Sequence, residues 1–289
     1  MKATAKLRTL IKSGNTHIAP GVFDGLSARM VERTGFELIY ASGGAIARSI
    51  GYPDLGLLSM TEVCQRLAHI TEITELPIVA DADTGYGNAL NVHRTVRMFE
   101  RLGIAALHLE DQQFPKRCGH LEGKSIVSKT EMVQKLRAAR DALHDPDFVL
   151  IGRTDAIAIE GIDAAIDRAH AYAEAGADVV FVEAPQSLAQ IEQIARHIKH
   201  PKLINMFYGG KTPLVPIARL QELGYNIVII PSDLQRAVIY AIEKTLGAIK
   251  EHGDSASLKD QLASFNEREK VVGTDDFMRL DSKFGHNRS

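Results

Sequence analysis

One pattern recurs along the chain: a helical stretch ends in glycine, and an apolar run follows almost at once. The four clearest glycines are Gly35, Gly103, Gly176 and Gly224, and the runs after them are Phe36–Tyr40, Ile104–Leu109, Asp178–Val182 and Ile227–Ile230. Glycine ends a helix in a left-handed turn without steric cost. The runs are short and apolar on successive positions, which is typical of strands buried on both faces of a parallel sheet.

Four more runs of this kind raise the number of predicted strands to eight: His17–Val22, Pro77–Asp81, Phe148–Arg153 and Leu203–Met206. Amphipathic helices separate the strands, and three of them start with capping boxes: Ser59 with Glu62, Ser128 with Glu131, and Ser187 with Gln190. Eight strands that alternate with helices predict an α/β fold, the (β/α)8 TIM barrel, over residues 1–250. A doubly wound open sheet is the alternative, but no G-x-G-x-x-G follows the first strand.

The pattern changes beyond Ile249. Residues 251–255 are typical of a linker, and Ser257–Lys270 predicts one further helix, so we expect residues 251–289 to form a C-terminal helical extension. An extra helix often docks on a neighbouring subunit, which favours an oligomer. A helix that packs on its own barrel is the alternative.

Composition excludes several partners. The formal net charge is −2, from 34 Lys and Arg against 36 Asp and Glu, so nothing favours nucleic acid or an anionic membrane surface. No apolar run approaches membrane-spanning length, and the first residues lack the apolar core of a signal peptide. Two cysteines allow no disulfide framework, so we expect a cytoplasmic protein.

Polar residues follow six consecutive predicted strands. They are Ser42 with Gly43 and Gly44, Asp81 with Asp83, Glu110 with Asp111, Arg153 with Asp155, Glu183, and Asn205. Barrel enzymes carry their chemistry at the C-terminal ends of the strands. We therefore expect these groups to meet at one mouth.

Three acids of this set predict a metal site: Asp81, Asp83 and Glu110. Oxygen ligands without sulfur or nitrogen partners suit Mg²⁺, with Mn²⁺ as the alternative ion. For any one of these acids alone, N-capping or an ion pair with Arg153 is the simpler interpretation.

Ser42-Gly43-Gly44 resembles an anion nest, in which backbone N–H groups approach a carboxylate. Arg153 is a candidate bidentate clamp on a substrate carboxylate, and an internal ion pair with Glu183 or Asp155 explains it equally well.

Cys118 lies in a loop with Lys116, Arg117 and His120. Neighbouring cations stabilise a thiolate, and we expect this thiol to act as a general acid or base. Cys64 lies instead in the predicted helix Thr61–Thr74, where a cysteine is usually a small apolar core residue.

The run Lys116-Arg117-Cys118-Gly119-His120 resembles the catalytic loop of the isocitrate lyase / phosphoenolpyruvate mutase superfamily. The resemblance covers about His17 to Tyr240. Further matching motifs are Tyr40-x-Ser42-Gly43-Gly44, Pro53-Asp54-Leu55-Gly56, Asp81-x-Asp83-x-Gly85-x-Gly87, His108-x-Glu110-Asp111-Gln112, Arg153-Thr154-Asp155 and Asn205. The short-chain branch, with the 2,3-dimethylmalate and 2-methylisocitrate lyases, is the most similar.

The resemblance implies a Mg²⁺-dependent carbon–carbon lyase, an oxo-acid-lyase that splits a 2-hydroxy di- or tricarboxylate into an α-keto acid such as pyruvate and a second carboxylate. It assigns Asp81, Asp83 and Glu110 to the metal, with Asp54 behind them, and Ser42, Gly43, Gly44, Arg153, Glu183 and Asn205 to the substrate. Cys118 would protonate the aci-carboxylate that cleavage leaves, while Lys116, Arg117 and His120 tune the thiol and bind charge. Tyr40 is a candidate base for the 2-hydroxyl.

The resemblance also implies a mobile catalytic loop and an eighth barrel helix that swaps between subunits, in a homotetramer built as a dimer of dimers. Three positions depart from the pattern of methylisocitrate lyases: Phe265 stands in place of an arginine, Leu121-Glu122-Gly123 in place of a run with Arg-Pro, and Tyr208 in place of a Glu. Two of these departures leave fewer cations near a distal carboxylate. They favour a substituted malate, similar to 2,3-dimethylmalate, over a tricarboxylate. The alternatives are 2-methylisocitrate cleavage, oxaloacetate decarboxylation or hydrolysis, and a non-catalytic binding barrel.

Overall fold

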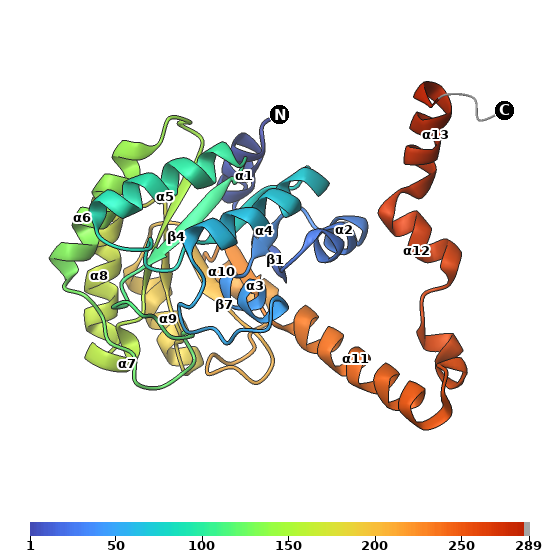
Figure 1. The fold of residues 1–289 in the computed structure, drawn as a ribbon. Helices are drawn as coiled ribbons and strands as arrows, with labels where there is room; N and C mark the ends of the chain where they lie inside the picture. The colour runs from blue at the N-terminus through green and yellow to red at the C-terminus, as the bar shows by residue number, and fades with distance from the viewer. Residues whose placement is uncertain (286–289) are drawn as a thin grey trace. The chain divides into compact units, whose positions relative to one another are not determined.

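The computed structural model describes residues 1–285, and its centre is a closed barrel of eight parallel strands (Figure 1). Each strand pairs with the next in the chain, and β8 pairs with β1. The strands are β1 His17–Val22, β2 Ile39–Ala41, β3 Ile78–Asp81, β4 Ala106–Glu110, β5 Val149–Thr154, β6 Val179–Val182, β7 Lys202–Asn205 and β8 Ile227–Ile230. The predicted (β/α)8 barrel is confirmed.

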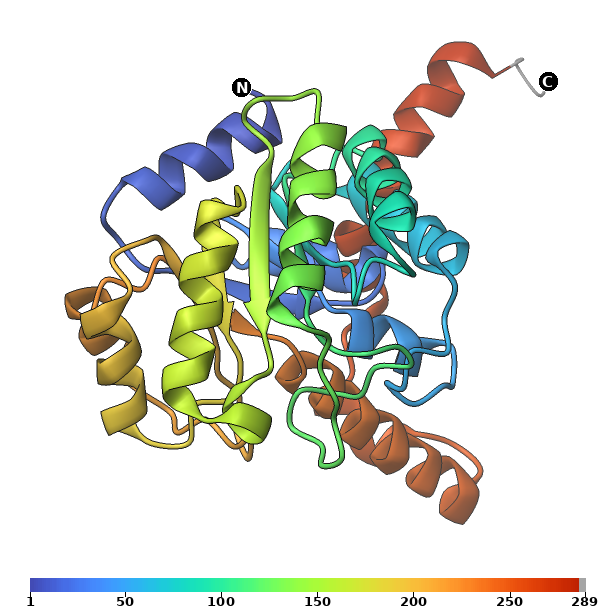
Figure 2. The ribbon, with the colours of Figure 1, turned by 90° about the vertical axis from the view of Figure 1, so that its left-hand side faces the viewer.

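The strands are buried on both faces, as their sequence predicts. Every residue of β3 to β7 is buried, because the inner face packs within the barrel and the outer face packs on helices. The interior contains Val79, Ile151 and Phe181, and Leu7 of helix α1 (Ala3–Lys12) belongs to the same cluster. Helices surround the strands in both ribbon views (Figures 1 and 2).

Nine more helices belong to the barrel: α2 Gly25–Arg33, α3 Gly43–Ser49, α4 Met60–Ile73, α5 Ala89–Arg101, α6 Lys129–Ala142, α7 Ile157–Glu160, α8 Ile162–Glu174, α9 Leu188–His197 and α10 Ile217–Glu222. The predicted helix ends are confirmed, since Gly35, Gly103, Gly176 and Gly224 all have positive φ. Ser59 forms a reciprocal capping box with Glu62, whereas Ser128 and Ser187 only accept the backbone bond.

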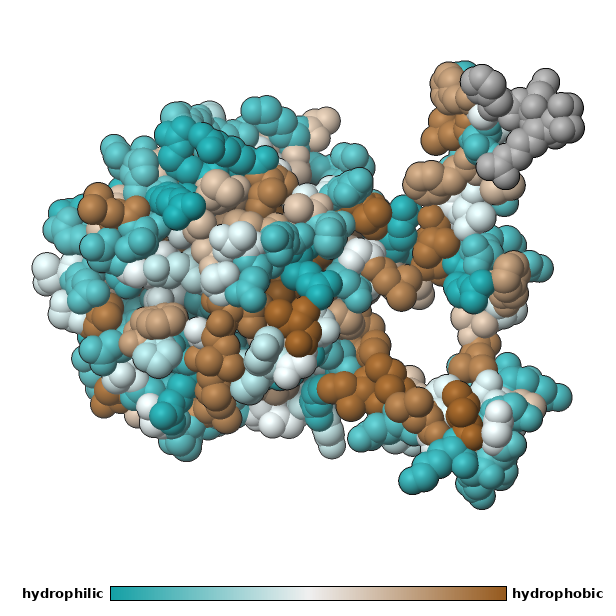
Figure 3. Space-filling view, viewed as in Figure 1, coloured by the Kyte–Doolittle hydropathy of each residue, from teal (hydrophilic) through white to brown (hydrophobic). Residues whose placement is uncertain are grey.

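The chain divides into two compact units after Gln235, near the start of α11 (Asp233–His252). The sequence predicts the boundary at residue 250, which lies near the end of this helix. In the second unit, α11 presents exposed apolar side chains over residues 238–249, and Figure 3 shows them as brown atoms along the helix. No helix within residues 1–285 has the length and apolar character that crossing a membrane requires.

The prediction of a single helix over Ser257–Lys270 is wrong. A 3-10 helix spans Ala256–Gln261, and α12 begins afresh at Phe265 and runs to Val272. Ser264 and Glu267 form a capping box that requires an extended residue at the cap, which separates these two helices. Gly273, with φ +73°, then separates α12 from α13 (Thr274–Phe284).

Candidate active site

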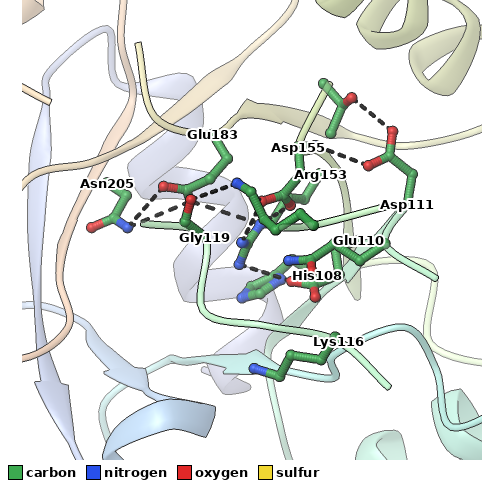
Figure 4. Close-up of polar contacts among 12 residues, drawn as sticks. His108, Glu110, Asp111, Lys116, Gly119, Arg153, Asp155, Glu183 and Asn205 are labelled. Atoms are coloured by element: carbon green, nitrogen blue, oxygen red, sulfur yellow. Dashed lines mark hydrogen bonds and ion pairs between the residues drawn. The ribbon is translucent and has the colours of Figure 1, made fainter. Parts of the chain in front are cut away.

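The polar side chains that end the strands meet at the mouth of the barrel, as predicted (Figure 4). The register places β3 beside β4 with Asp81 opposite His108, and β4 beside β5 with Glu110 opposite Arg153. All four side chains are buried, and so are Glu183 and Asn205. The mouth is therefore a dense cluster of ionisable groups held by rigid strands.

Asp81, His108 and Glu110 form a possible metal site. Each offers one ligand atom, and these atoms lie within 4.8 Å of one another. His108 was not among the predicted ligands, although it lies two residues before Glu110 on one strand. Residues i and i+2 of a strand share a face, so this spacing was the signal for it.

Asp83 does not join this cluster. Its Oδ1 lies 2.7 Å from Lys116 Nζ, and its backbone has a φ of 47°. Burial outweighs the ammonium charge and raises the pKa of the Asp83 carboxyl to about 6. The three ligand atoms that lie close together thus belong to Asp81, His108 and Glu110, while the Asp83 carboxylate pairs with Lys116.

The unsatisfied atoms of the cluster fit a cation. Both carboxylate oxygens of Glu110 and Nδ1 of His108 are buried without a hydrogen-bond partner among residues 1–285, although Glu110 Oε2 lies 2.9 Å from Arg153 Nη1. Burial raises the pKa of Glu110 and lowers that of His108 to about 4. A neutral imidazole and carboxylate oxygens are competent ligands of a divalent ion, whose charge compensates the burial.

Asp81 is the member of the cluster that stays ionised. Burial acts to raise its pKa, but the charges of His108, Lys116 and Arg153 hold the pKa well below its usual range. Its oxygens also accept hydrogen bonds from the Tyr40 hydroxyl and the Asp83 backbone N–H.

Tyr40 fits a hydrogen-bonding role better than the predicted role of base. Its hydroxyl lies 3.3 Å from Asp81 Oδ2 and 2.8 Å from His108 Nε2. Burial, together with the Asp81 charge, raises the pKa of this phenol well above its usual value. The phenol therefore keeps its proton near neutral pH.

Arg153 forms the internal ion pairs that the sequence allowed as the alternative to a clamp on a substrate carboxylate. Its Nε and Nη2 bond both oxygens of Asp155, at 2.9 and 3.1 Å, and its Nη1 contacts Glu110. The bonds to Asp155 use two of the five guanidinium N–H groups, and the Glu110 contact is an ion pair without hydrogen-bond geometry, so both terminal nitrogens keep N–H groups. Arg153 is thus fixed in place and still has donors for a ligand.

Asp111 supports this arrangement from behind. Its carboxylate accepts bonds from the Thr154 hydroxyl at 2.7 Å, the Asp155 backbone N–H at 2.9 Å and the Tyr172 hydroxyl at 2.7 Å. It is fully buried. Asp111 therefore fixes the end of β5, including Asp155, and lies outside the ligand cluster.

The segment Ser42-Gly43-Gly44, predicted to be an anion nest, lies at the start of α3. Ser42 caps the helix through Ala45 N–H, and Gly43 and Gly44 form its first turn. A Cβ on Gly43 would lie 2.7 Å from Asp81 Oδ2, and one on Gly44 would lie 2.8 Å from Asp54 Oδ2. Only glycine therefore allows this turn to approach the two carboxylates so closely.

The loop between β4 and α6 covers the mouth. Its two ends pair as an antiparallel bridge between Gln112 and Ile126, with Gln113 N–H donating to Ser125 O at 2.8 Å. Residues 114–124 between these ends form what we call the loop tip. A Cβ on Gly119 of the tip would lie 2.7 Å from Arg153 Nη2, so the tip rests directly on the strand ends.

Lys116 and His120 are two of the side chains that attach the tip to the mouth. Lys116 is buried and pairs with Asp54 and Asp83. His120 contacts Glu183 at 3.1 Å, while its Nδ1 accepts the Lys211 backbone N–H at 2.9 Å. Asn205 also donates to Glu183, at 3.2 Å. The predicted catalytic loop thus lies closed over the predicted substrate residues.

Arg117 is the predicted site residue whose side chain does not point into the mouth. Its side chain is exposed and donates to the Glu122 carbonyl at 3.1 Å, within the loop itself. The other predicted residues lie at the mouth or on the tip above it.

Cys118 lies between these contacts, but its environment differs from the predicted one. Burial raises the pKa of the thiol, and the Asp54 and Glu183 charges act in the same direction. The expectation of a stabilised thiolate is wrong, because carboxylates neutralise Lys116 and Arg117 points elsewhere. The protonated thiol is nevertheless the form that a proton donor needs.

Residues 7–250 match the model of the phosphoenolpyruvate phosphomutase family. The chain belongs to this family. The predicted resemblance to the isocitrate lyase / phosphoenolpyruvate mutase superfamily is therefore confirmed.

Curated relatives of the chain are lyases. It is 42% identical, over 293 aligned positions, to 2,3-dimethylmalate lyase from Eubacterium barkeri, with all of both chains covered. It is 43% identical over 277 positions to 2-methylisocitrate lyase from Aeropyrum pernix, with 96% of this chain and 89% of the relative covered. These relatives agree with the predicted class, a carbon–carbon lyase.

Solved structures share the whole fold. A 2,3-dimethylmalate lyase superposes with a TM-score of 0.93 at 34% identity, covering 100% of this chain and 97% of the other. An oxaloacetate acetylhydrolase with 3,3-difluorooxalacetate gives the same score and identity, covering 100% and 99%. A phosphonopyruvate hydrolase complex with oxalate and Mg²⁺ gives 0.90 at 29% identity, covering 98% and 99%.

Proposed function

We propose that the protein is a Mg²⁺-dependent lyase that cleaves a substituted malate, similar to 2,3-dimethylmalate, into an α-keto acid such as pyruvate and a second carboxylate. One observation carries the proposal. A cluster of possible metal ligands, Asp81, His108 and Glu110, lies beneath a closed loop tip that carries the protonated thiol of Cys118.

Asp81, His108 and Glu110 would hold the metal ion, with Asp54 and Asp83 behind them fixing Lys116. Bound there, Mg²⁺ would act as a Lewis acid on the 2-oxygen of the substrate. Oxygen-rich ligands favour Mg²⁺ or Mn²⁺ over softer ions, and the Mg²⁺ present in the phosphonopyruvate hydrolase structure supports the same choice.

The keto-acid half of the substrate needs a carboxylate site. Gly43 and Gly44 provide backbone N–H groups beside Asp81, and Ser42 fixes their turn. Arg153 adds the N–H groups of its terminal nitrogens that its bonds to Asp155 leave unused. Glu183 and Asn205 orient His120 at the opposite side of the mouth.

Cleavage would begin with transfer of the 2-hydroxyl proton to water, from which the Cys118 thiolate later recovers its proton. The C2–C3 bond then breaks, its electron pair moves to the second fragment as an aci-carboxylate, and the Cys118 thiol donates the proton that forms the new C–H bond. The resulting thiolate recovers a proton before the next turnover. The raised pKa of Cys118 suits this role, because the thiol is protonated when the carbanion forms.

The distal part of the substrate meets few cations. On the tip, Glu122 pairs with Lys211 of the loop after β7, and Leu121 next to Glu122 is exposed. Tyr208 is 70% exposed in the loop after β7. These features support a dicarboxylate with alkyl substituents over a tricarboxylate.

Cleavage of 2-methylisocitrate is the second candidate, and the relative from Aeropyrum pernix favours it. Because the fold is similar to that of oxaloacetate acetylhydrolase, oxaloacetate is also a substrate to test. A barrel that binds carboxylates without turnover is the remaining alternative.

We also propose a homotetramer in which α11 packs on a neighbouring subunit. The exposed apolar residues of α11 support this, and so do Leu26 and Met30 on α2, which are 56% and 41% exposed. Both cysteines are free thiols, which agrees with the proposed reducing cytoplasm.

The test is a side-by-side assay of 2,3-dimethylmalate, 2-methylisocitrate, malate, citrate and oxaloacetate with Mg²⁺, following pyruvate and the second product. We expect 2,3-dimethylmalate to give the highest kcat/KM, chelation to abolish it, and Cys118→Ser to remove turnover while metal binding persists. Turnover of 2-methylisocitrate far above that of 2,3-dimethylmalate would transfer the assignment to the second candidate. A Cys118→Ser protein with wild-type turnover would refute the assigned proton donor.

A further inference from the structure

The reaction proposed above gives no role to Lys124, whose side chain is buried. Its side chain is 2% exposed, although its chain neighbours Gly123 and Ser125 are both exposed. Burying an ammonium is unfavourable unless strong partners compensate the lost hydration. The loop therefore places this charge inward against a steep penalty.

Two acceptors compensate the penalty, and they lie on different parts of the protein. Lys124 Nζ lies 2.8 Å from Asp155 Oδ1 at the end of β5. The same ammonium donates to the backbone carbonyl of Gly119, the residue between Cys118 and His120. Lys124 thus joins the barrel to the loop tip at Gly119, next to the Cys118 thiol.

Asp155 is a rigid anchor for this contact. Its carboxylate is fully buried and bonds Arg153 through both oxygens, and its backbone N–H donates to Asp111. Arg153 in turn contacts Glu110 of the possible metal site. A displacement of Lys124 would therefore release the tip without moving the anchor.

Lys116 provides the matching attachment on the other side of the thiol, through Asp54 and Asp83. Cys118 lies between these two buried lysines in the chain. Without Lys124, the tip would keep its contacts through Lys116 and His120 but would lose the bond to the Gly119 carbonyl beside the thiol.

We propose that Lys124 is a positioning residue, which holds the loop tip closed and so sets the place of the Cys118 thiol. It contacts no reacting atom in this assignment. The catalytic consequence rests on the proposed function, whereas the closure itself does not.

The experiment compares Lys124→Met with Lys129→Met. Lys129 lies five residues further on, pairs with Asp167 and is 44% exposed, so the control removes an ion pair outside the mouth. The first readout is alkylation of Cys118 by iodoacetamide, followed by peptide mass spectrometry to separate it from Cys64. We expect Lys124→Met to raise this rate about tenfold or more, because opening exposes the thiol. Lys129→Met should leave it unchanged.

The second readout is kinetic. Misplacing a catalytic group by about 1 Å lowers rates by up to about 10²-fold, so Lys124→Met should lose most of its kcat, with a smaller change in KM. Lys124→Arg, which keeps the charge, should recover part of the kcat and part of the protection of Cys118 from alkylation. Lys124→Ala supplemented with ethylammonium should regain slow alkylation, which a merely structural role would not produce.

Wild-type alkylation and kcat in a folded Lys124→Met protein would overturn the proposal. Far-UV circular dichroism and the urea midpoint establish folding, and should Lys124→Met fail to fold, the amine rescue of Lys124→Ala decides. If the wild-type enzyme cleaves none of the tested acids, the alkylation comparison still tests Lys124, so its failure and that of the proposed function are separable.

Discussion

The contact between Gly119 and the strand ends allows a quantitative test. In Gly119→Ala, the new Cβ would lie 2.7 Å from Arg153 Nη2 and 2.8 Å from Glu183 Cγ, whereas ordinary contacts begin at 3.4 Å. The difference, 3.4 − 2.7 = 0.7 Å, is the smallest displacement that relieves the closer contact. Arg153 is held by Glu110 and Asp155, so the loop tip must move instead.

A displacement approaching 1 Å at a catalytic group lowers a rate by up to about 10²-fold. We therefore expect kcat/KM of Gly119→Ala to fall about 10- to 100-fold, which corresponds to about 1.4–2.7 kcal/mol of transition-state stabilisation. The free energy of unfolding should fall by no more than about 1–3 kcal/mol, since Gly119 is buried against the strand ends but lies in the loop tip and not in the hydrophobic core.

Pyruvate release, coupled to lactate dehydrogenase, measures the rate, and urea unfolding measures stability. Gly247→Ala is the matched control, because a Cβ there meets no atom within 4 Å. A Gly119→Ala enzyme whose kcat/KM stays within about twofold of wild type would refute the reasoning, since the tip would then tolerate the displacement.

Three further predictions follow from the site and the barrel. His108→Ala should weaken Mn²⁺ binding, measured by calorimetry, at least about tenfold, whereas Asp83→Asn should weaken it much less. A larger loss of Mn²⁺ affinity in Asp83→Asn than in His108→Ala would favour the ligands predicted from the sequence, Asp81, Asp83 and Glu110. The raised pKa of Cys118 predicts that iodoacetamide alkylation at pH 7–8 is slower than for an ordinary cysteine and still rises above pH about 8.5, so a plateau below that pH would contradict the burial argument. Asp178 accepts three hydrogen bonds that outweigh its burial and lower its pKa, so its contribution to stability is fully present above pH about 3.9 and is lost as pH falls through the lower folded pKa. Asp178→Asn should therefore lower the free energy of unfolding at pH 7 by about 1.5–3 kcal/mol, against less than about 0.5 kcal/mol for the exposed Asp141→Asn, and equal urea midpoints for the two variants would contradict it.

The barrel was predictable because its strands carry one strong signal. A strand buried on both faces needs apolar residues at successive positions, and a helix that ends just before it needs a left-handed residue. The second unit has no such strand within residues 236–285. Its helix starts were still present in the sequence, since Ser264 with Glu267 is a capping box, but the polar positions around it gave no periodicity to support it.

Within the site, the sequence located the groups but not their pairing. His108 lies within an apolar strand and was not among the predicted ligands, and only the register shows it beside Asp81. Asp83 was predicted from its strand-end position, which could not show that its carboxylate pairs with Lys116. The Cys118 environment was predicted from neighbours in the chain, whereas its pKa depends on carboxylates that folding brings from other strands.

The bridge between Gln112 and Ile126 has a consequence for how new specificities arise in this barrel. The loop leaves and re-enters the scaffold at adjacent points, so residues 114–124 can change in sequence or length without altering the spacing of the strands beneath. Grafting this segment from a relative with another substrate is thus a compact route to a chimaera, provided that the recipient retains carboxylates that match the grafted lysines.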